Sequence, residues 1–283
     1  MNVLSLFDGI SCGRLALERS GLSIDRYYSS EINEYAIRIA KKNWPETIHL
    51  GPVQEVSGEV LPQIDLLIGG SPCQGFSFAG KRLNFDDPRS KLFFEFTRIL
   101  RECNPRFFML ENVKMKQDCR DIISKYLGVE PIEINSALVS AQNRKRLYWT
   151  NIPNVSQPKD KGILLIDVVF SNSMSNFTLS EKAIAYMNRE VSGGRTHWDF
   201  KHHSDTENPK SAAVVANFFK GVPYNVLKHN GLIRHFYPVE CERLQTLPDG
   251  YTDGVSNAQR YKAIGNGWTV DVVAHILKHI SHM

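Results

Sequence analysis

The first half of the chain alternates short apolar runs with amphipathic helical patterns, and this alternation limits the possible folds more than any other feature. The apolar runs cover residues 3–7, 24–31, 64–70, 106–113 and 146–152. Helical patterns follow several of them, and the one that begins at Pro88 has Asp87 as a capping residue. Strand, turn and helix in repeated order predict an α/β fold, in which helices cover both faces of a parallel sheet.

Four residues that could bind a ligand or take part in a reaction lie where these predicted strands end. They are Gly9, Glu31, Cys73 and Glu111. Ligands of open parallel sheets bind beyond the carboxyl ends of the strands. The sequence therefore predicts one site at this edge of the sheet, built from acids, a thiol and a glycine turn.

The glycine turn after the first strand, residues 7–13, suits a small adenosine cofactor. Its glycines let backbone amides approach a ligand at a helix N-terminus, but their spacing is not the G-x-G-x-x-G that binds a dinucleotide pyrophosphate. Glu31 is placed to bind two ribose hydroxyls. S-adenosylmethionine fits both observations, with its carboxylate on the amides and its sulfonium near the Phe7 ring. The alternative is a turn that serves only packing.

Cys73 stands on a loop that Pro72 stiffens, directly after a buried strand. A free cysteine is often a core residue. Cationic neighbours such as Arg144 or Arg146 would favour its thiolate and make it a nucleophile. A carboxylate beside such a thiolate has to be protonated or bound to the substrate. We therefore expect Glu111 to donate a proton to a heterocycle.

The alternation of strands and helices stops between residues 153 and 235, which are rich in Ser, Asn, Lys and His. We interpret this region as a small irregular domain, and residues 1–152 plus 236–283 as the catalytic and cofactor-binding domain. The final helical pattern carries His275 and His279 at a spacing that could bind a metal. No third ligand is evident, so we expect no metal site.

Composition and charge narrow the class of protein. Five cysteines without a C-x-x-C pair argue against a disulfide framework or a zinc ribbon and favour a reducing cytoplasm. A net charge of +4 permits a nucleic-acid partner without requiring one. No window approaches the ~18 uncharged apolar residues that span a membrane, so we expect no membrane contact.

Six motifs, in this order along the chain, resemble those of the DNA (cytosine-5)-methyltransferases. They are FDG (7–9), SPCQGFSFAG (71–80), ENV (111–113), QNRKR (142–146), RHFYPVECERLQTLPDGY (234–251) and GNGW (265–268). The chain looks like a compact bacterial or phage enzyme related to the catalytic domain of animal de novo methyltransferases. The resemblance implies a Rossmann-like S-adenosylmethionine-dependent methyltransferase fold, with residues 153–235 as target-recognition domain.

The resemblance also implies a mechanism. A cytosine swings out of double-stranded DNA, and Cys73 attacks ring carbon 6 so that carbon 5 accepts the methyl group. Glu111 binds ring nitrogen 3, Arg146 binds the cytosine carbonyl, and Arg144 orders the pocket. We count these four residues as catalytic.

The same resemblance assigns the binding residues and the partners. The cofactor residues are Phe7, Asp8, Gly9, Ile10, Glu31, Ile32, Val53, Leu92, Asn266 and Trp268. The DNA-binding residues are Gln74, Ser77, Lys81, Arg82, Arg195 and Lys220, with Asn188, Arg189, Lys201 and Lys210 as further candidates. We expect a cytoplasmic, DNA-associated monomer of bacterial or phage origin, with any cognate restriction endonuclease acting separately.

One position departs from the family pattern. Family members commonly carry an acidic residue after the third strand, where it meets the adenine amino group, and this chain has Pro52 there. We expect weaker cofactor binding as a result. Two other functions stay open at this point: an RNA (tRNA) cytosine-5 methyltransferase, and a catalytically silent DNA-binding accessory protein.

Overall fold

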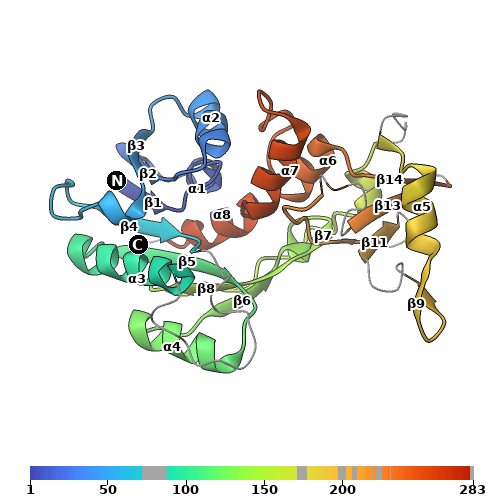
Figure 1. The fold of residues 1–283 in the computed structure, drawn as a ribbon. Helices are drawn as coiled ribbons and strands as arrows, with labels where there is room; N and C mark the ends of the chain where they lie inside the picture. The colour runs from blue at the N-terminus through green and yellow to red at the C-terminus, as the bar shows by residue number, and fades with distance from the viewer. Residues whose placement is uncertain are drawn as a thin grey trace. The chain divides into compact units, whose positions relative to one another are not determined.

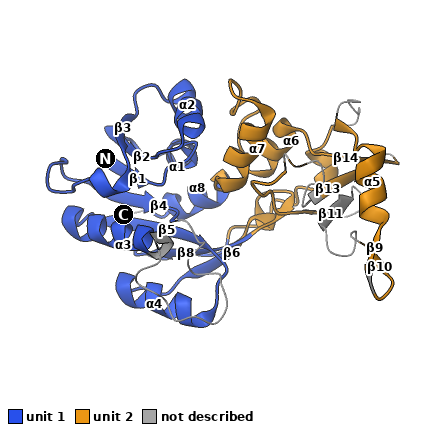
Figure 2. Cartoon of the chain, viewed as in Figure 1, with its two compact units in different colours: residues 1–134, 145–157, 271–283 blue, residues 135–144, 158–270 orange. Residues whose placement is uncertain are grey.

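The computed structural model describes residues 1–71, 88–170, 177–196, 202–205, 209–218, 220, 225–229 and 231–280. The predicted site residues outside these ranges are Cys73, Gln74, Ser77, Lys81, Arg82 and Lys201. Asp87, the expected cap of a helix, also lies outside them. The chain forms two compact units (Figure 2). The first comprises residues 1–134, 145–157 and 271–283, and the second comprises residues 135–144 and 158–270.

A mostly parallel sheet forms the centre of the first unit (Figure 1). In the described part of the chain it has seven strands, in the order β3-β2-β1-β4-β5-β8-β6. These are β1 (Asn2–Leu6), β2 (Arg26–Ser30), β3 (Ile48–Gly51), β4 (Leu66–Gly69), β5 (Phe107–Val113), β6 (Ile132–Asn135) and β8 (Lys145–Thr150). Strands β1 to β5 run parallel, which confirms the α/β prediction. Strand β8 runs antiparallel to β5, whereas the sequence pattern predicted a parallel strand here.

Helices cover both faces of this sheet, as predicted. On one face, α3 (Pro88–Cys103) and α4 (Gln117–Leu127) pack on alternate strand residues such as Leu4, Leu67 and Leu110, because successive side chains of a strand point to opposite faces. On the other face lie α1 (Cys12–Ser20) and α8 (Val270–Lys278). An ion pair of 2.7 Å joins Arg19 of α1 to Asp271 of α8.

Local chemistry explains where several helices begin and end. The side chain of Asn33 accepts hydrogen bonds from the N–H groups of Tyr35 and Ala36 and so caps α2 (Glu34–Asn43). Gly21 ends α1 with a φ of 75°, a left-handed conformation that glycine adopts at low cost. The Asn33 cap thus fixes where α2 begins after β2, and Gly21 fixes where α1 ends before the chain enters β2.

The second unit is built from short elements. Its helices are α5 (Glu181–Asn188), α6 (Pro238–Leu244) and α7 (Asn257–Asn266), and η3 (Ser136–Leu138) and η4 (Leu165–Asp167) are 3-10 turns. Its strands are β7 (Gln142–Asn143), β9 (Glu190–Ser192), β10 (Arg195–Thr196), β11 (His202–Asp205), β12 (Ser211–Ala212), β13 (Asn225–His229) and β14 (Leu232–Arg234). The boundaries of these compact units differ from the predicted boundaries at residues 152 and 236. The predicted boundaries separate a catalytic from a target-recognition domain, and that division stays a prediction.

Two buried carboxylates of the second unit are paired with arginines. Glu240 in α6 is fully buried and forms a bidentate ion pair with Arg234, with two contacts of 2.7 Å. Glu242, also fully buried, accepts a hydrogen bond of 2.9 Å from Arg260 of α7. Such pairs satisfy charges that burial would otherwise penalise strongly. In the described ranges, no helix combines the length and the apolar character needed to cross a membrane.

Candidate active site

The turn after β1 is held from inside by Asp8. Its buried carboxylate accepts hydrogen bonds from the hydroxyls of Tyr27 at 2.6 Å, Ser29 at 3.0 Å and Ser11 at 2.5 Å. Phe7 and Ser11 both have positive φ, near 57° and 59°, a conformation that non-glycine residues seldom adopt and that the surroundings must enforce. The Asp8 side chain thus fixes the shape of the turn.

Glu31, at the tip of β2, is joined to the same turn. One of its carboxylate oxygens accepts the N–H of Gly9 at 2.8 Å, and the other accepts the N–H groups of Ile32 and Asn33, each at 2.8 Å. An ionised carboxylate offers about four acceptor sites, so one remains for a ligand hydroxyl. Ile32 beside it is 76% exposed, an unusual position for a large apolar side chain.

The turn after β3 lies at the next strand end. Gly51 has a φ of 79°, and its carbonyl accepts a hydrogen bond of 2.8 Å from the Ser30 hydroxyl. Pro52 then begins the 3-10 turn η1 (Val53–Glu55). The Val53 side chain is buried in the core, and its carbonyl accepts a hydrogen bond of 3.1 Å from Arg98. Of the other predicted cofactor residues, Ile10 is buried and Leu92 packs against the core.

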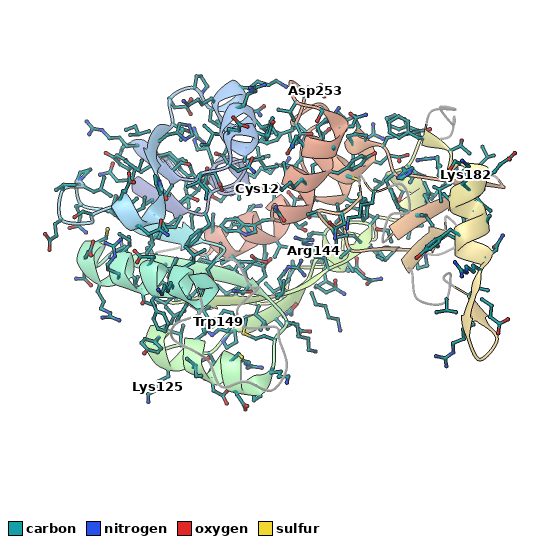
Figure 3. The ribbon with its side chains drawn as sticks, in the orientation of Figure 1. Cys12, Lys125, Arg144, Trp149, Lys182 and Asp253 are labelled. Carbon is teal, nitrogen blue, oxygen red and sulfur yellow. The ribbon has the colours of Figure 1, made fainter. Side chains whose placement is uncertain are left out.

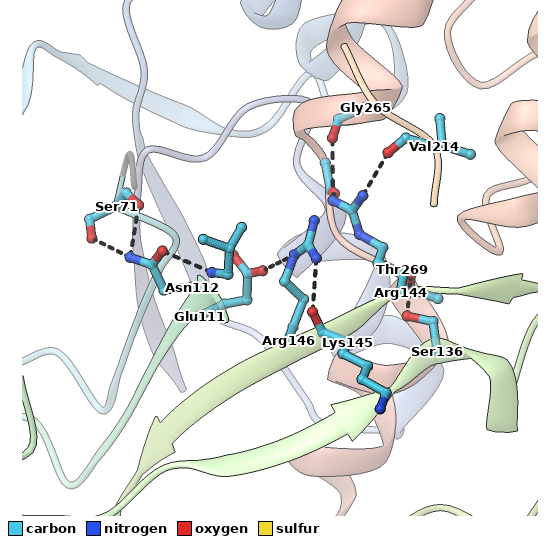
Figure 4. Close-up of polar contacts among 12 residues, drawn as sticks. Ser71, Glu111, Asn112, Ser136, Arg144, Lys145, Arg146, Val214, Gly265 and Thr269 are labelled. Carbon is cyan, nitrogen blue, oxygen red and sulfur yellow. Dashed lines mark hydrogen bonds and ion pairs between the residues drawn. The ribbon is translucent and has the colours of Figure 1, made fainter. Parts of the chain in front are cut away.

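The ENV motif ends β5 and uses its residues on two different faces (Figure 4). Glu111 forms an ion pair of 3.1 Å with Arg146 of β8. Because Val113 lies opposite Arg146 in the antiparallel ladder, Glu111 and Arg146 are diagonal neighbours on one face. Asn112 points to the other face, and its amide donates to the carbonyl and the hydroxyl of Ser71, at 3.2 and 3.3 Å.

Ser71 immediately precedes the Pro72-Cys73 dipeptide, so Asn112 anchors the last described residue before the predicted nucleophile. Both ends of this contact are buried, with Ser71 4% and Asn112 2% exposed. The Asn112 side-chain oxygen also accepts the Val113 N–H at 2.8 Å. One asparagine therefore ties the end of β4 to the end of β5.

Three of the four cysteines in the described ranges have thiols with a raised pKa. Burial, aided by the nearby charge of Glu102, raises the pKa of the Cys103 thiol to about 11. Burial raises the pKa of Cys241 well above its ordinary value and also raises that of Cys119. Cys12 is buried at the start of α1. Because thiolate is the reactive form of cysteine, the surroundings of Cys103, Cys119 and Cys241 favour inert thiols.

The Gln142-x-Arg144 part of the fourth motif lies in the second unit and is buried. The Arg144 guanidinium donates to the carbonyls of Val214 at 2.7 Å, Gly265 at 3.2 Å and Gly267 at 2.9 Å (Figure 4). Gly265 and Gly267 belong to the GNGW motif at the end of α7. In this arrangement the Arg144 guanidinium therefore faces backbone carbonyl oxygens.

Gln245 is a residue of this network that sequence analysis did not single out. Its amide donates to the carbonyls of Ile264 at 2.9 Å and Gly267 at 3.0 Å, and its oxygen accepts from Gln142 at 2.9 Å and from Thr269 at 2.7 Å. All of these polar groups are buried. Gln245 lies within the fifth motif, and its side chain bonds four partners in this buried network.

The sequence profile of the family described as "C-5 cytosine-specific DNA methylase" matches this chain over residues 1–183 and 170–282. Together these ranges span nearly the whole chain. The chain belongs to this family. It is a methyltransferase that uses S-adenosylmethionine to methylate carbon 5 of cytosine in DNA.

Named relatives agree with this assignment, and a solved structure has a similar fold. The methyltransferase is 30% identical to the Type II methyltransferase M1.ScrFI of Lactococcus lactis subsp. cremoris, over 96% of this chain and 75% of the relative. It is 27% identical to the Type II methyltransferase M.HhaI of Haemophilus parahaemolyticus, over 99% and 94%. Its fold is similar to that of Entamoeba histolytica methyltransferase EhMeth, with a TM-score of 0.81, 18% identity, and 100% and 98% of the two chains covered.

The other predicted site residues of the methyltransferase differ in how exposed they are. Asn266 is exposed at the end of α7, and Trp268 is buried two residues later. Arg195 and Lys220 are both exposed, and Arg195 follows a Gly193-Gly194 turn in the β9–β10 hairpin. His275 and His279 form an edge-on ring pair with centroids 5.3 Å apart. Within the described ranges, no group of three potential metal ligands occurs.

Proposed function

We propose that the methyltransferase acts on a cytosine flipped out of double-stranded DNA, through a temporary covalent bond to Cys73. The Cys73 thiolate would add to ring carbon 6, and the electron pair of the carbon 5–carbon 6 double bond would become available at carbon 5. When bound, S-adenosylmethionine would supply the methyl group from its sulfonium: the sulfur–methyl bond breaks as the carbon 5–methyl bond forms, and the neutral thioether leaves. Transfer of the carbon 5 proton to solvent would then re-form the double bond and expel Cys73 as its thiolate.

The observation that carries this proposal is the anchoring of Ser71 by Asn112. It fixes the backbone two residues before Cys73, at the end of a parallel strand, where sheets of this class bind their ligands. The surroundings of Cys103, Cys119 and Cys241 raise the pKa of each of their thiols and so support Cys73 as the nucleophile.

The pair of Glu111 and Arg146 suits the polar edge of cytosine. That edge presents a carbonyl oxygen, ring nitrogen 3 and an amino group side by side. A guanidinium supplies donors for the carbonyl, and a carboxyl group can hydrogen-bond both nitrogen 3 and the amino group. The two side chains lie 3.1 Å apart on one face of β5 and β8, so a single base can reach both.

The turn residues at the tips of β1 and β2 fit S-adenosylmethionine. The Glu31 carboxylate, fixed by three backbone N–H groups, would accept a ribose hydroxyl, and the exposed Ile32 would lie against the adenine. Phe7 and Gly9 would face the methionine end. We assign the cofactor roles of Asp8, Ile10, Val53 and Leu92 to backbone contacts or support, since their side chains are buried or packed on the core.

We further propose that residues 153–235 form the target-recognition domain. The exposed side chains of Arg195 and Lys220 support this role, because cations contact phosphates and base edges. Gln74, Ser77, Lys81 and Arg82 would contribute from the Cys73 loop. We expect the enzyme to work as a monomer on chromosomal DNA in the cytoplasm, with any restriction endonuclease acting separately.

Duplex DNA that contains 5-fluorocytosine tests the covalent step. Fluorine at carbon 5 cannot leave as a proton does, so the adduct with Cys73 persists after methyl transfer. We expect a denaturation-resistant protein–DNA complex with the wild-type chain and with Cys119→Ala, a control at another cysteine, but not with Cys73→Ala. A complex with Cys73→Ala, or none with the wild type on substrate that it methylates, would refute the mechanism. Transfer RNA containing the same analogue tests the RNA alternative.

A further inference from the structure

All three N–H donors of the Lys210 ammonium form hydrogen bonds within the second unit. The Nζ atom donates to the carbonyl oxygens of Ala137 at 2.8 Å, Ser140 at 3.0 Å and Ile163 at 2.6 Å. An ammonium has three N–H donors, so these bonds account for all of them. Lys210 is also one of the basic residues that the family resemblance suggested for DNA contact. In the structure, no N–H group of this ammonium remains for a phosphate oxygen.

The carbonyls that Lys210 binds belong to the segment that leads into the fourth motif. Ala137 and Ser140 lie in the turn before Gln142, and Ile163 lies in the chain that runs up to η4. Residues next to Lys210 pair with the same segment. The Ser211 N–H donates to the Ala141 carbonyl at 2.7 Å, and β12 runs parallel to β7.

The strand pairing and the side-chain contacts reinforce each other a few residues further on. The Val214 N–H donates to the Gln142 side chain at 3.1 Å, and its carbonyl accepts from Arg144 at 2.7 Å. Residues 209–214 therefore hold residues 137–144 along their whole length. The chain reaches Arg146, the predicted cytosine-binding arginine, only two residues after this braced segment.

We propose that Lys210 is a positioning residue of the methyl-transfer reaction, which fixes the segment that presents Arg144 and Arg146. This proposal rests on the proposed function of Arg146. Three carbonyl oxygens converge on the Nζ atom, and without a cation there they repel one another and lose their donors. The turn at residues 136–141 would then relax, and the arginines that follow it would shift. A displacement of about 1 Å costs about a hundredfold in rate when it misplaces a catalytic group.

Steady-state kinetics on duplex DNA separate this role from DNA contact. For Lys210→Met we expect kcat to fall by about tenfold to a hundredfold, with KM for DNA within about twofold of the wild type. A phosphate contact predicts the reverse: kcat unchanged, KM raised, and the slope of log affinity against log salt reduced by about one. That second pattern, or wild-type kinetics, would overturn the proposal. Lys125→Met is the matched control, because Lys125 is exposed on α4 (Figure 3).

Chemical rescue gives a readout that a general loss of packing does not move. Lys210→Ala lacks three carbons and the ammonium, the equivalent of n-propylammonium. We expect n-propylammonium to restore part of the lost kcat, and tetramethylammonium, which has no N–H donor, to restore none. Absence of rescue, or equal rescue by both ions, would refute the carbonyl-binding role. If the truncated variants do not fold, Lys210→Arg decides, since it keeps the charge without the tetrahedral donors. We expect it to fold with lowered kcat and unchanged KM, and wild-type kcat or a raised KM for it would refute the role.

Wild-type trapping on 5-fluorocytosine DNA distinguishes the two levels of failure. A wild-type chain that traps DNA while Lys210→Met shows wild-type kinetics would refute only the role of Lys210. A wild-type chain that methylates DNA without trapping would refute the covalent mechanism itself.

Discussion

Replacing Asn112 by alanine tests the link between the end of β5 and the predicted nucleophile. The substitution removes the donor to the carbonyl and hydroxyl of Ser71 and the acceptor of the Val113 N–H. A made hydrogen bond contributes about 0.5–1.5 kcal/mol, and a buried group left without a partner costs about 1–3 kcal/mol. The two Ser71 contacts are long and Val113 is partly exposed, so we expect a loss of about 2–4 kcal/mol in the free energy of unfolding.

The effect on activity should exceed the effect on stability. Ser71 lies two residues before Cys73, and its release frees the backbone that carries the sulfur. We expect the single-turnover rate of methyl transfer to fall about a hundredfold, because a misplacement of about 1 Å costs that much. Affinity for S-adenosylmethionine should stay unchanged, since the Gly9–Glu31 contact lies on other strands. Radiolabelled methyl transfer and isothermal titration measure the two quantities.

Asn151→Ala is the matched control, because Asn151 makes equivalent contacts at the opposite end of β5. Its side chain accepts the Phe108 N–H at 2.8 Å and donates to the Arg106 carbonyl at 3.0 Å. Asn151 is exposed, so water replaces these bonds and the loss should be about 1 kcal/mol. We expect its methyl-transfer rate to equal that of the wild type. Equal rate losses in both variants, or an unchanged rate in Asn112→Ala, would refute the reasoning.

Four further predictions concern single side chains. A β-carbon in Gly265→Ala would lie 2.2 Å from the Ala216 nitrogen, so the backbone has to move, and denaturant unfolding should show a loss of about 3 kcal/mol; an unchanged midpoint would contradict this. Pro52→Asp should tighten S-adenosylmethionine binding by isothermal titration, and equal or weaker affinity would count against an adenine contact there. Arg195→Ala should raise KM for DNA and lower the salt slope by about one, whereas an unchanged slope would remove Arg195 from the DNA interface. Burial, then the charge of Lys41, lowers the pKa of His49, so folding favours the neutral ring over the protonated one. The stability that comes from this preference is fully present above the unfolded pKa of about 6.5 and is lost as pH falls. His49→Phe should therefore lose less stability between pH 7 and pH 5 than the wild type, and parallel curves would refute this.

Strand position explains which strands the sequence predicted. The five predicted runs correspond to β1, β2, β4, β5 and β8, all of which have strands on both sides. The two strands that no apolar run marks, β3 and β6, are the edges of the sheet, and the strand before Pro52 was expected from the family resemblance alone. Ile48 in β3 is 40% exposed, and β6 has one buried residue, Ile134. An edge strand needs fewer apolar residues, so it produces no continuous hydrophobic run.

The part of the site that lies in the first unit could be predicted from the ends of the strands, for a simple topological reason. Parallel strands end at one edge, and the structure joins Gly9 to Glu31 and the end of β4 to the end of β5 there. No comparable rule predicts the second unit's network. Gln142 meets Gln245 across 102 intervening positions, and Lys210 meets Ala137 across 72. Such contacts join irregular segments, which carry no periodic signal.

The motif residues differ in whether their polar side-chain atoms are all bonded inside the protein or remain available to a ligand. Asp8, Asn112, Gln142 and Arg144 are buried, and their side chains bind hydroxyls, backbone groups or other buried side chains. Glu31, by contrast, is only partly buried and retains an acceptor for a ligand. We infer that substitutions in the buried group lower the rate through geometry. Their damage should follow the displacement of neighbouring backbone, and a shape-preserving change should spare more activity than a smaller side chain does.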